Sequence, residues 1–283
     1  MRTYHSSLSL SLPLNFLTME KNRIAIIGCG NLGKAIAKGL LDNPNYTAED
    51  ITVTKRNTAT LSDLSEAGIH VTSNNEEALS RADLILVALK PHNILHILDG
   101  LTEQLDPKRH VIVSLATGVS VSELQEVVGS DIPVFRAMPN TGADVNESVT
   151  CITGPNDQQE VLDRISQVFN SIGTTHVISE DLMDAATVLG ACGIAFVLRF
   201  MRAMVQGGIQ IGFDAKTATA IVNQTVKGAS QLVIERGLHP EAEIDKVTTP
   251  KGCTIAGLNE MEHNGFSSAL IKGIVSSYER IEK

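Results

Sequence analysis

The sequence predicts an α/β protein in two parts, a doubly wound sheet with helices on both faces followed by an all-helical part. Short apolar runs of strand length alternate with helical patterns up to about residue 178. Strands that alternate with helices form such sheets, because each crossover returns the chain to a neighbouring parallel strand. From Ser179 onward only helical patterns remain. We therefore expect an extension over residues 1–19, a sheet domain over 20–178 and a helical domain over 179–283.

The extension over residues 1–19 is rich in Ser and Leu, and Pro13 interrupts its apolar clusters. We expect it to be disordered, or the true start to be Met19, because it lacks a continuous apolar core and a small-residue cleavage site. A weak signal or transit segment is the alternative. No later run approaches the length of a membrane span, so we expect no membrane association.

Composition narrows the classes of partner. The net charge of −9 and the pI of about 5.4 argue against nucleic acid and anionic membranes, although one pocket can still collect cations. The four cysteines are scattered, with no C-x-x-C pair, which is typical of a reducing cytoplasmic protein.

A glycine-rich turn follows the first strand. Residues 24–27 form an apolar run, residues 28–33 read Gly-Cys-Gly-Asn-Leu-Gly, and a helix follows whose apolar face includes Ile36 and Leu40. This is the G-x-G-x-x-G of a dinucleotide turn in its required strand and helix context, so the sheet domain is of the Rossmann type. Gly28 permits the turn, Gly30 admits a pyrophosphate and Gly33 lets the helix pack closely.

The remaining elements of the sheet domain follow in order. We expect strands over 51–54, 70–72, 83–89, 111–115, 134–138, 149–153 and 174–178, and helices over 59–67, 75–80 and 157–172. Ligands of such sheets bind beyond the carboxyl ends of the strands. Asn75 and Lys90 therefore lie on the cofactor side, and the small residues from Ala116 to Gly118 leave room for a nicotinamide ring.

The end of the second strand selects the dinucleotide. An NAD site has an acidic side chain about 20 residues past the glycines, to bind the ribose 2′-hydroxyl. This chain has Lys55, Arg56 and Asn57 there. A guanidinium binds a 2′-phosphate through paired N–H bonds, so NADP is favoured. The alternative is a solvated basic turn.

The helical part predicts association between subunits. Long helices are expected over 183–211, 215–236 and 266–281, and the first is apolar nearly all round. A domain of about 100 residues hardly buries such a helix alone. We therefore expect an all-helical dimerisation domain.

A threonine-rich loop interrupts these helices at residues 247–254, before a helix that begins near Ile255. Free N–H groups and the dipole of a helix start suit a carboxylate, and a hydroxyl nearby suits a ring nitrogen. The alternative is an ordinary helix cap.

Several ordered motifs together resemble one family. They are Gly28-Cys29-Gly30-Asn31-Leu32-Gly33, Ala88-Leu89-Lys90-Pro91, Ser114-Leu115-Ala116-Thr117-Gly118, Arg136-Ala137-Met138-Pro139-Asn140-Thr141, Gly207-Gly208-Ile209, His239-Pro240, Val247-Thr248-Thr249-Pro250, Gly252, Thr254-Ile255 and Gly265-Phe266. From about Lys21 to Ile281 the chain resembles Δ1-pyrroline-5-carboxylate reductase, the last enzyme of proline biosynthesis.

The resemblance implies reduction of L-1-pyrroline-5-carboxylate to L-proline, with NADPH preferred over NADH, by a homodimer or larger homo-oligomer. It implies that Thr254 bonds the ring nitrogen as proton donor or relay, and that the N–H groups of Gly252 and Cys253 bind the substrate carboxylate beside Thr248 and Thr249. The cofactor residues that it implies are Gly28, Gly30, Asn31, Leu32, Gly33, Arg56 and Asn57 (both on the 2′-phosphate), Asn75, Ala88, Lys90 and Ala116.

The chain also departs from the family pattern. Residues 190–196 stand where the family usually has a Ser-Gly-Ser-Gly-Pro-Ala-Tyr-like segment, Lys251 replaces a usual glycine and Gly142 a usual proline. Arg202 and Gln206 stand where acidic residues are common. A reductase of another small imine, or a non-catalytic NADP-binding sensor or scaffold, is therefore an alternative.

Two further features have plainer interpretations. His92 and His96 are one helical turn apart but have no pattern of carboxylate partners, so we expect a surface helix and no metal. Cys253 has no nearby signature of a base, which argues against a nucleophile.

Overall fold

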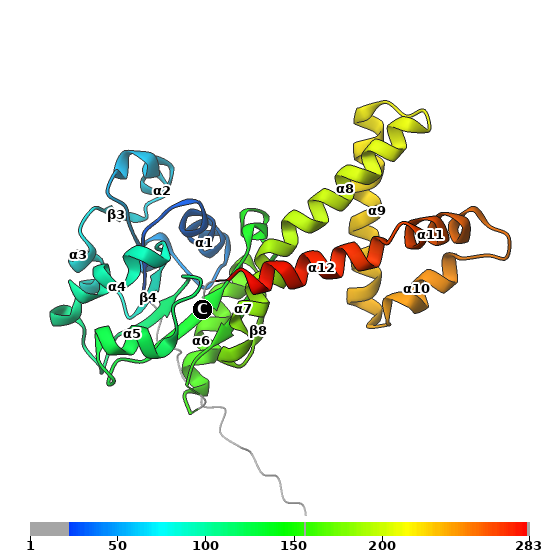
Figure 1. Cartoon of the computed structure of the whole chain (residues 1–283). Coiled ribbons are helices and arrows are strands. Elements are labelled where there is room, and N and C mark those ends of the chain that lie inside the picture. Colours follow the sequence, from blue (N-terminus) through cyan, green and yellow to red (C-terminus); the bar gives the residue numbers. More distant parts are fainter. Residues whose placement is uncertain (1–22, 156, 282–283) are drawn as a thin grey trace, which may run out of the picture.

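An eight-stranded sheet forms the N-terminal part of the computed structural model, which describes residues 23–155 and 157–281 (Figure 1). The expected extension over residues 1–19 lies outside the described residues. The strand order is β3-β2-β1-β4-β5-β6-β7-β8. The strands are β1 (Ile24–Ile27), β2 (Ile51–Thr54), β3 (His70–Thr72), β4 (Leu84–Val87), β5 (Val111–Ser114), β6 (Val134–Met138), β7 (Ser148–Thr153) and β8 (Gly173–Val177).

The predicted Rossmann-type sheet is confirmed, and the structure adds one antiparallel pair. Strands β3 to β6 run parallel, whereas β7 runs antiparallel to β6, with Arg136 opposite Thr153. Only the short turn η4 (Thr141–Val145) separates β6 from β7. A parallel return needs a crossover of a dozen or more residues, so this connection permits only the antiparallel arrangement.

Helices cover both faces of the sheet. They are α1 (Asn31–Asp42), α2 (Ser62–Glu66), α3 (Asn75–Ser80), α4 (Pro91–Asp99), α5 (Val121–Val128) and α6 (Gln159–Phe169). One core joins Ile26, Ile36 and Phe169, and the other joins Ile27 and Leu124. Because alternate residues of β1 face opposite layers, its unbroken apolar run is buried on both sides.

Several predicted limits were wrong by a few residues. The helix expected over 59–67 divides into the 3₁₀ turn η2 (Thr58–Leu61) and α2, and the strand expected over 83–89 keeps only its central four residues. The helix expected over 157–172 begins at Gln159, and its last turn is the 3₁₀ turn η5 (Asn170–Ile172). Helix ends often tighten in this way.

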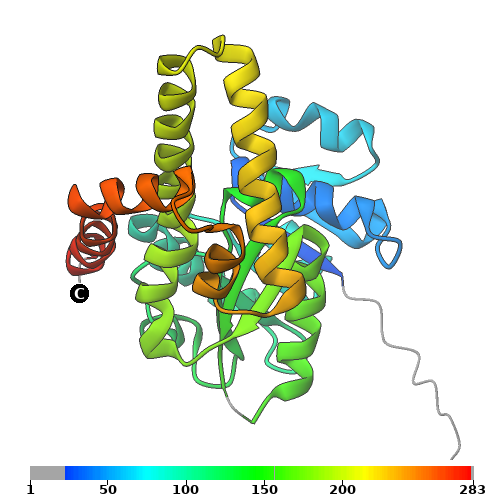
Figure 2. The same ribbon diagram turned by 90° about the vertical axis from the view of Figure 1, so that its right-hand side faces the viewer.

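Every regular element among the described residues of the C-terminal half is a helix, and these helices extend away from the sheet in Figure 1 and lie in front of it in Figure 2. Its elements are η6 (Glu180–Leu182), α7 (Met183–Ala186), the π-helix η7 (Thr187–Cys192), α8 (Gly193–Gln210), α9 (Ala215–Arg236), α10 (Pro240–Val247), α11 (Cys253–His263) and α12 (Phe266–Glu279). Neither the π-helix nor the separate helix α10 was predicted from the sequence.

The run from Glu180 to Gln210 is long and apolar enough to cross a membrane by length and composition, with a mean hydropathy of 1.8. The expectation that no run approaches this length was wrong, because the chain continues in helical form through Gly190 and Gly193. Only 11% of its most apolar window is buried within the chain. A helix of this kind needs an apolar environment that one copy does not provide.

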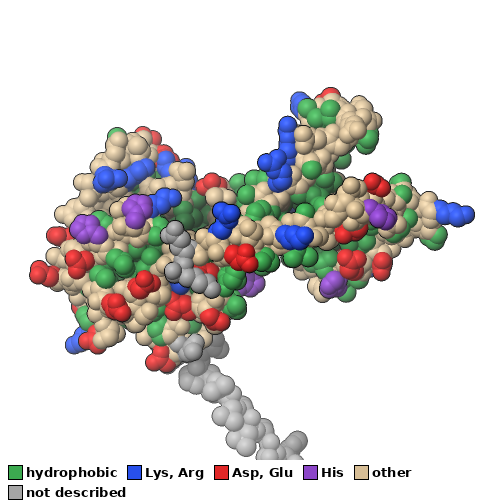
Figure 3. All heavy atoms as spheres, viewed as in Figure 1, with side chains coloured by type: hydrophobic (Ala, Val, Ile, Leu, Met, Phe, Trp, Pro, Cys, Tyr) green, Lys and Arg blue, Asp and Glu red, His purple; other side chains and the backbone are tan. Residues whose placement is uncertain are grey.

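Apolar side chains remain exposed along the helical half (Figure 3). Leu198 is 57% exposed, Ile234 70% and Ile271 60%. Among the described residues, the buried cluster of this half consists of Val205, Ala218 and Val222. Many exposed apolar side chains on one part of a protein indicate an interaction site.

Close packing at Gly39 generates a stability prediction. A Cβ added there would overlap Cγ2 of Ile172 and lie 2.8 Å from the carbonyl oxygen of Ser171. Gly39→Ala should therefore destabilise the protein by about 1–3 kcal/mol, although alanine is the better helix former. Thermal denaturation measures the effect, with Gln167→Ala on an exposed helical face as the control. A melting temperature raised by Gly39→Ala would contradict this packing.

Candidate functional site

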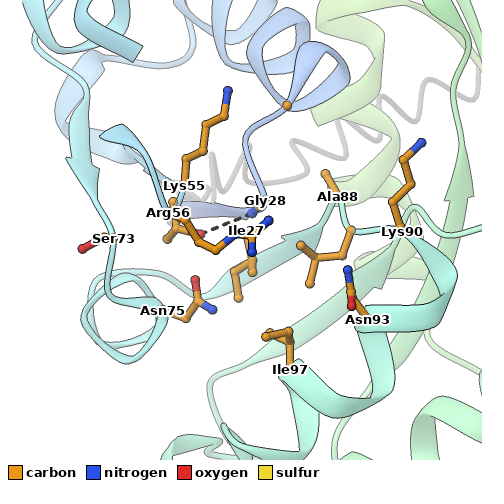
Figure 4. Close-up of a pocket in the computed structure, with 13 residues that line it drawn as sticks. Ile27, Gly28, Lys55, Arg56, Ser73, Asn75, Ala88, Lys90, Asn93 and Ile97 are labelled. Carbon is orange, nitrogen blue, oxygen red and sulfur yellow. Dashed lines mark hydrogen bonds between the residues drawn. The ribbon is translucent and has the colours of Figure 1, made fainter. Parts of the chain in front are cut away.

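Two adjoining cavities lie beyond the carboxyl ends of β1, β2, β4 and β5, and we call them together the glycine-turn crevice. The first, of about 400 Å³, is shown in Figure 4, and the second measures about 530 Å³. They share Gly28, Gly30, Ala88, Leu89 and Lys90. The second cavity also meets Asn31, Leu32, Gly33 and Ala116. The sheet therefore brings these residues from the loops after β1, β4 and β5 to one crevice.

The glycine turn is held by backbone contacts that side chains would obstruct. Gly28 has φ +87°, and a Cβ there would lie 2.9 Å from the carbonyl oxygen of Ala88. Its N–H donates to Oγ1 of Thr54 at 3.2 Å, which ties the turn to β2. At Gly33 a Cβ would lie 3.0 Å from Cγ2 of Ile26. The turn needs glycine for its conformation at one end and for close helix packing at the other.

The N-terminus of α1 opens onto the second cavity. Gly30 is its N-cap and supplies no side-chain hydrogen bond, and its first turn carries no acidic residue. A Cβ at Gly30 would meet only the carbonyl oxygen of Gly28, 4.0 Å away. The free N–H groups of a helix start, with open space in front of them, suit an anion.

Basic side chains border the first cavity. Lys55 and Arg56 follow β2, and Lys90 follows β4 (Figure 4). Among the described residues no carboxylate lines this cavity, and no ion pair of these three cations is found. In a chain of net charge −9, a cavity lined by unpaired cations favours an anionic ligand.

Asn57 does not line the crevice. Its side-chain oxygen accepts the N–H of Ala59 at 3.2 Å and caps η2. The 2′-phosphate contact expected of Asn57 stays a prediction, because a phosphate would accept from the Nδ2 donor of Asn57 and not from this oxygen. Thr54, Lys55 and Ser73 are among the lining residues of the first cavity that were missing from the predicted site. Lys55 adjoins Arg56 in the sequence, and that basic pair was the available signal.

A hydrogen-bonded cluster fixes the turn that carries Ser73 and Asn75. Glu77 accepts the hydroxyl of Thr72 at 2.6 Å and lies 2.7 Å from Nε2 of His70. The bonds from Thr72 and His70 hold the pKa of Glu77 below its usual range. The turn is therefore closed by polar contacts to β3, and Asn75 faces the cavity at the first position of α3.

The far end of the second cavity is formed by small residues and by the start of η4. Ala116 is 2% exposed, and Thr117 and Thr141 line the wall beside it. Nearby, the N–H of Gly142 donates to Oδ1 of Asn140 at 2.9 Å, and a Cβ at Gly142 would overlap the carbonyl oxygen of Glu147. Gly142 stands where a proline is usual in the family. Its N–H forms a hydrogen bond that proline, which has no N–H, cannot form.

The threonine-rich loop lies away from the crevice of its own chain. It connects α10 to α11 in the projecting helical half (Figure 1). None of the predicted residues Thr248, Thr249, Gly252, Cys253 and Thr254 lines the crevice. One copy therefore does not bring the two predicted halves of the site together.

The loop leaves part of its hydrogen-bonding capacity free. Thr248 donates its hydroxyl to the carbonyl oxygen of Ile244 at 2.8 Å, and the N–H of Gly252 donates to the carbonyl oxygen of Thr249 at 2.9 Å. The carboxylate contact expected of the Gly252 N–H stays a prediction, and in this structure that N–H donates within the loop. Cys253 and Thr254 are exposed at the first positions of α11, behind an N-cap without a side chain.

The glycine turn carries a buried thiol, Cys29, and no metal cluster is found among the described residues. Burial raises the pKa of Cys29 to about 11, despite the opposing charges of Lys55 and Lys34. Among residues 23–155 and 157–281 no group of three His, Cys, Asp or Glu side chains lies close enough to hold a metal ion. A neutral thiol is a poor nucleophile and metal ligand, so Cys29 has a packing role.

Comparison with known proteins gives matches over nearly the whole chain. A family model described as pyrroline-5-carboxylate reductase dimerisation matches residues 180–283, and one described as NADP oxidoreductase, coenzyme F420-dependent, matches residues 23–118. Pyrroline-5-carboxylate reductase 2 of Dictyostelium discoideum is 40% identical, with 94% of each chain covered. Pyrroline-5-carboxylate reductase 1 of that organism is 44% identical over 93% of this chain, which spans half of that relative's length. The enzyme of Escherichia coli is 33% identical, with 94% of this chain and 98% of the relative covered.

Solved structures agree with these matches. A pyrroline-5-carboxylate reductase from Coxiella burnetii superposes with a TM-score of 0.87 at 26% identity, over 92% of this chain and 97% of that chain. A Plasmodium falciparum pyrroline carboxylate reductase with NADP bound gives 0.81 at 26% identity, over 93% and 97%.

The buried thiol of Cys29 generates a reactivity prediction. With its pKa raised from 9.0 to about 11, Cys29 should react with iodoacetamide at least about a hundredfold more slowly in the native protein than in urea, because the thiolate is the reactive form. Peptide mass spectrometry after timed labelling measures both rates. Equal rates in the folded and unfolded protein would show that the glycine turn opens freely.

Proposed function

The chain belongs to the pyrroline-5-carboxylate reductase family, and we propose that it reduces 1-pyrroline-5-carboxylate to proline with NADPH in a site built from two copies of the chain. The family comprises NADP-dependent oxidoreductases that catalyse the last step of proline biosynthesis. The observation that carries the proposal is the crevice itself, where a glycine turn, a free helix N-terminus and unpaired cations adjoin. We propose a cytoplasmic location, which the scattered cysteines support.

The residues of the crevice fit an NADP cofactor. The glycine turn and the N–H groups at the start of α1 would hold the pyrophosphate. Arg56, Lys55 and Ser73 would hold the 2′-phosphate, since a guanidinium and an ammonium find no other partner there. Asn75 lines the same cavity. Ala116 and Thr117 border the remaining end, where small side chains leave room for a flat ring. When bound, the cofactor supplies the hydride.

The start of α11 suits the substrate. The exposed N–H groups of Cys253 and Thr254 and the positive end of the helix dipole would bind the carboxylate. The hydroxyl of Thr254 would hydrogen-bond the ring nitrogen and orient the imine or relay a proton. A protonated imine accepts hydride readily, so a strong protein acid is not required at this position.

A second copy completes the site in this proposal. The match to a dimerisation family over residues 180–283 indicates a homo-oligomer. We propose that the apolar faces of α8, α9 and α12 pack against those of another copy, and that this association brings the threonine-rich loop of one chain to the crevice of another. Two halves held in this way would exclude water and align the reacting atoms.

A spectrophotometric assay tests the function together with the role of Thr254. The purified protein should oxidise NADPH when pyrroline-5-carboxylate is added and should form an equal amount of proline. Thr254→Val removes the hydroxyl and keeps the shape, so it should lower kcat by about tenfold or more, while the Kd of NADPH stays unchanged. Thr219→Val, which alters an exposed hydroxyl on α9, is the control.

The outcomes of that assay separate the alternatives. Turnover of a different cyclic imine alone would make the protein a reductase of another substrate. NADPH binding without turnover of any imine would leave a sensor or scaffold. Equal kinetics in Thr254→Val and the unaltered protein would remove the proposed role of that hydroxyl.

Cofactor preference provides a second test. Arg56→Ala should raise the KM of NADPH by about tenfold or more, because a charged hydrogen bond to the 2′-phosphate contributes roughly 1.5–3 kcal/mol. The KM of NADH should hardly change, because NADH has no 2′-phosphate. Arg81→Ala, at an exposed site that does not line the crevice, is the matched control. An equal rise of KM for both cofactors would contradict the assignment.

A further inference from the structure

The middle of β6 is joined to the start of the helical half by a charged contact. Nη1 of Arg136 donates to Oε1 of Glu180 at 3.1 Å. The same carboxylate oxygen accepts the N–H of Val121 at 2.7 Å. Glu180 opens the helical half, Arg136 lies within the sheet and Val121 begins α5. One carboxylate therefore connects three elements where the two halves meet.

A second contact joins the loop after β6 to the π-helix. Nδ2 of Asn140 donates to the carbonyl oxygen of Gly190 at 3.1 Å, and the backbone N–H of Asn140 donates to Oγ of Ser148 at 3.0 Å. Asn140 is 7% exposed. A π-turn interrupts the regular helical hydrogen bonds, so a carbonyl there can accept a donor from outside the helix. The helix is thus held at Glu180 and again at Gly190.

Both contacts adjoin the wall of the glycine-turn crevice. Arg136 pairs in the sheet with Ser114, and the loop that follows Ser114 carries Ala116. Thr141, which lines the same cavity, comes directly after Asn140. Asn140 is thus the direct neighbour of a residue that lines the crevice. Arg136 pairs with Ser114, which lies two residues before Ala116.

The charged contact is an inefficient way to stabilise a fold. The side chain of Arg136 is 5% exposed, and among the described residues its buried Nε has no hydrogen-bond partner. Removing a guanidinium from water costs several kcal/mol, and the Glu180 side chain is 39% exposed, so solvent weakens the attraction that would offset this cost. The contribution of the pair is therefore geometric, because it defines where the helix meets the sheet.

We propose that Arg136, Glu180 and Asn140 are positioning residues that fix the angle at which the helical half leaves the sheet. The proposal rests on the proposed function, in which the threonine-rich loop of one copy meets the crevice of another. Helix α8 has 18 residues and is therefore about 27 Å long, so a tilt of about 5° at its base moves its far end by about 2 Å. A misplacement of about 1 Å can cost about a hundredfold in rate.

Glu180→Gln tests the charged contact, because it removes the charge and keeps an acceptor for the Val121 N–H. We expect kcat/KM for pyrroline-5-carboxylate to fall by about tenfold, with the Kd of NADPH within about twofold and the oligomer mass unchanged. Fluorescence titration and light scattering give the last two quantities. Asp181→Asn, the same charge change at the adjacent exposed residue, should leave all three values unchanged.

A double variant separates positioning from the cost of an unpaired charge. In Arg136→Met with Glu180→Gln neither charge remains, so the defect should persist if the pair sets the angle. Recovery of kcat/KM in the double variant would overturn the proposal, as would full activity in Glu180→Gln or a parallel loss of NADPH affinity.

Small-angle scattering supplies a readout that does not depend on turnover. The scattering profile of Glu180→Gln should differ from that of the unaltered protein, whereas the profile of Asp181→Asn should not. If the unaltered protein binds NADPH but does not reduce pyrroline-5-carboxylate, the proposed function fails. Identical scattering profiles of the unaltered protein, Glu180→Gln and Asp181→Asn would overturn the positioning role, whatever the result of the activity assay.

Discussion

The helical half of this chain cannot bury its own apolar surface, and the rest of the molecule's organisation depends on that constraint. Its longest helical run has the hydropathy of a membrane span, yet little of it is covered within one copy. The family model that matches this half is a dimerisation domain. This match suggests a homo-oligomer, and association would cover exposed apolar surface that is costly in water. The substrate site proposed above, shared between two copies, is consistent with a domain of this kind.

The sheet half does not depend on a second copy in this way, because its crevice is largely preformed within one chain. Parallel strands end at the same edge, so loops that are distant in sequence converge there. The glycine turn is fixed by Thr54, and the β3–α3 turn is fixed by Glu77. In the proposed site the sheet half holds the cofactor and the helical half of another copy holds the substrate. The proposed reaction would then depend on how accurately the halves are oriented.

Hydrogen bonds and backbone conformations describe how the structure accommodates the departures from the family pattern. Gly142 donates a hydrogen bond in a space that excludes a Cβ. Lys251 has φ +60° in the threonine-rich loop, a conformation that favours glycine and costs a lysine about 1 kcal/mol. The segment over 190–196 continues the long helix from its π-turn, where Gly190 accepts the side chain of Asn140. Local contacts therefore explain Gly142 and the segment over 190–196, whereas Lys251 adopts a strained backbone conformation.

The sequence by itself determined the elements whose signals are local. The buried strand, glycine turn and helix at residues 24–42 form a contiguous pattern, and the basic pair after β2 and the helical periodicity beyond Ser179 are equally short-range. Tertiary structure alone decided which polar groups are free. Asn57 caps a turn, the Gly252 N–H is bonded, and Arg136 meets Glu180 across 44 residues. It also decided that β7 reverses and that the threonine-rich loop lies far from the crevice of its own chain. A hydrogen bond depends on where two elements meet in space, and spacing along a chain does not encode that distance.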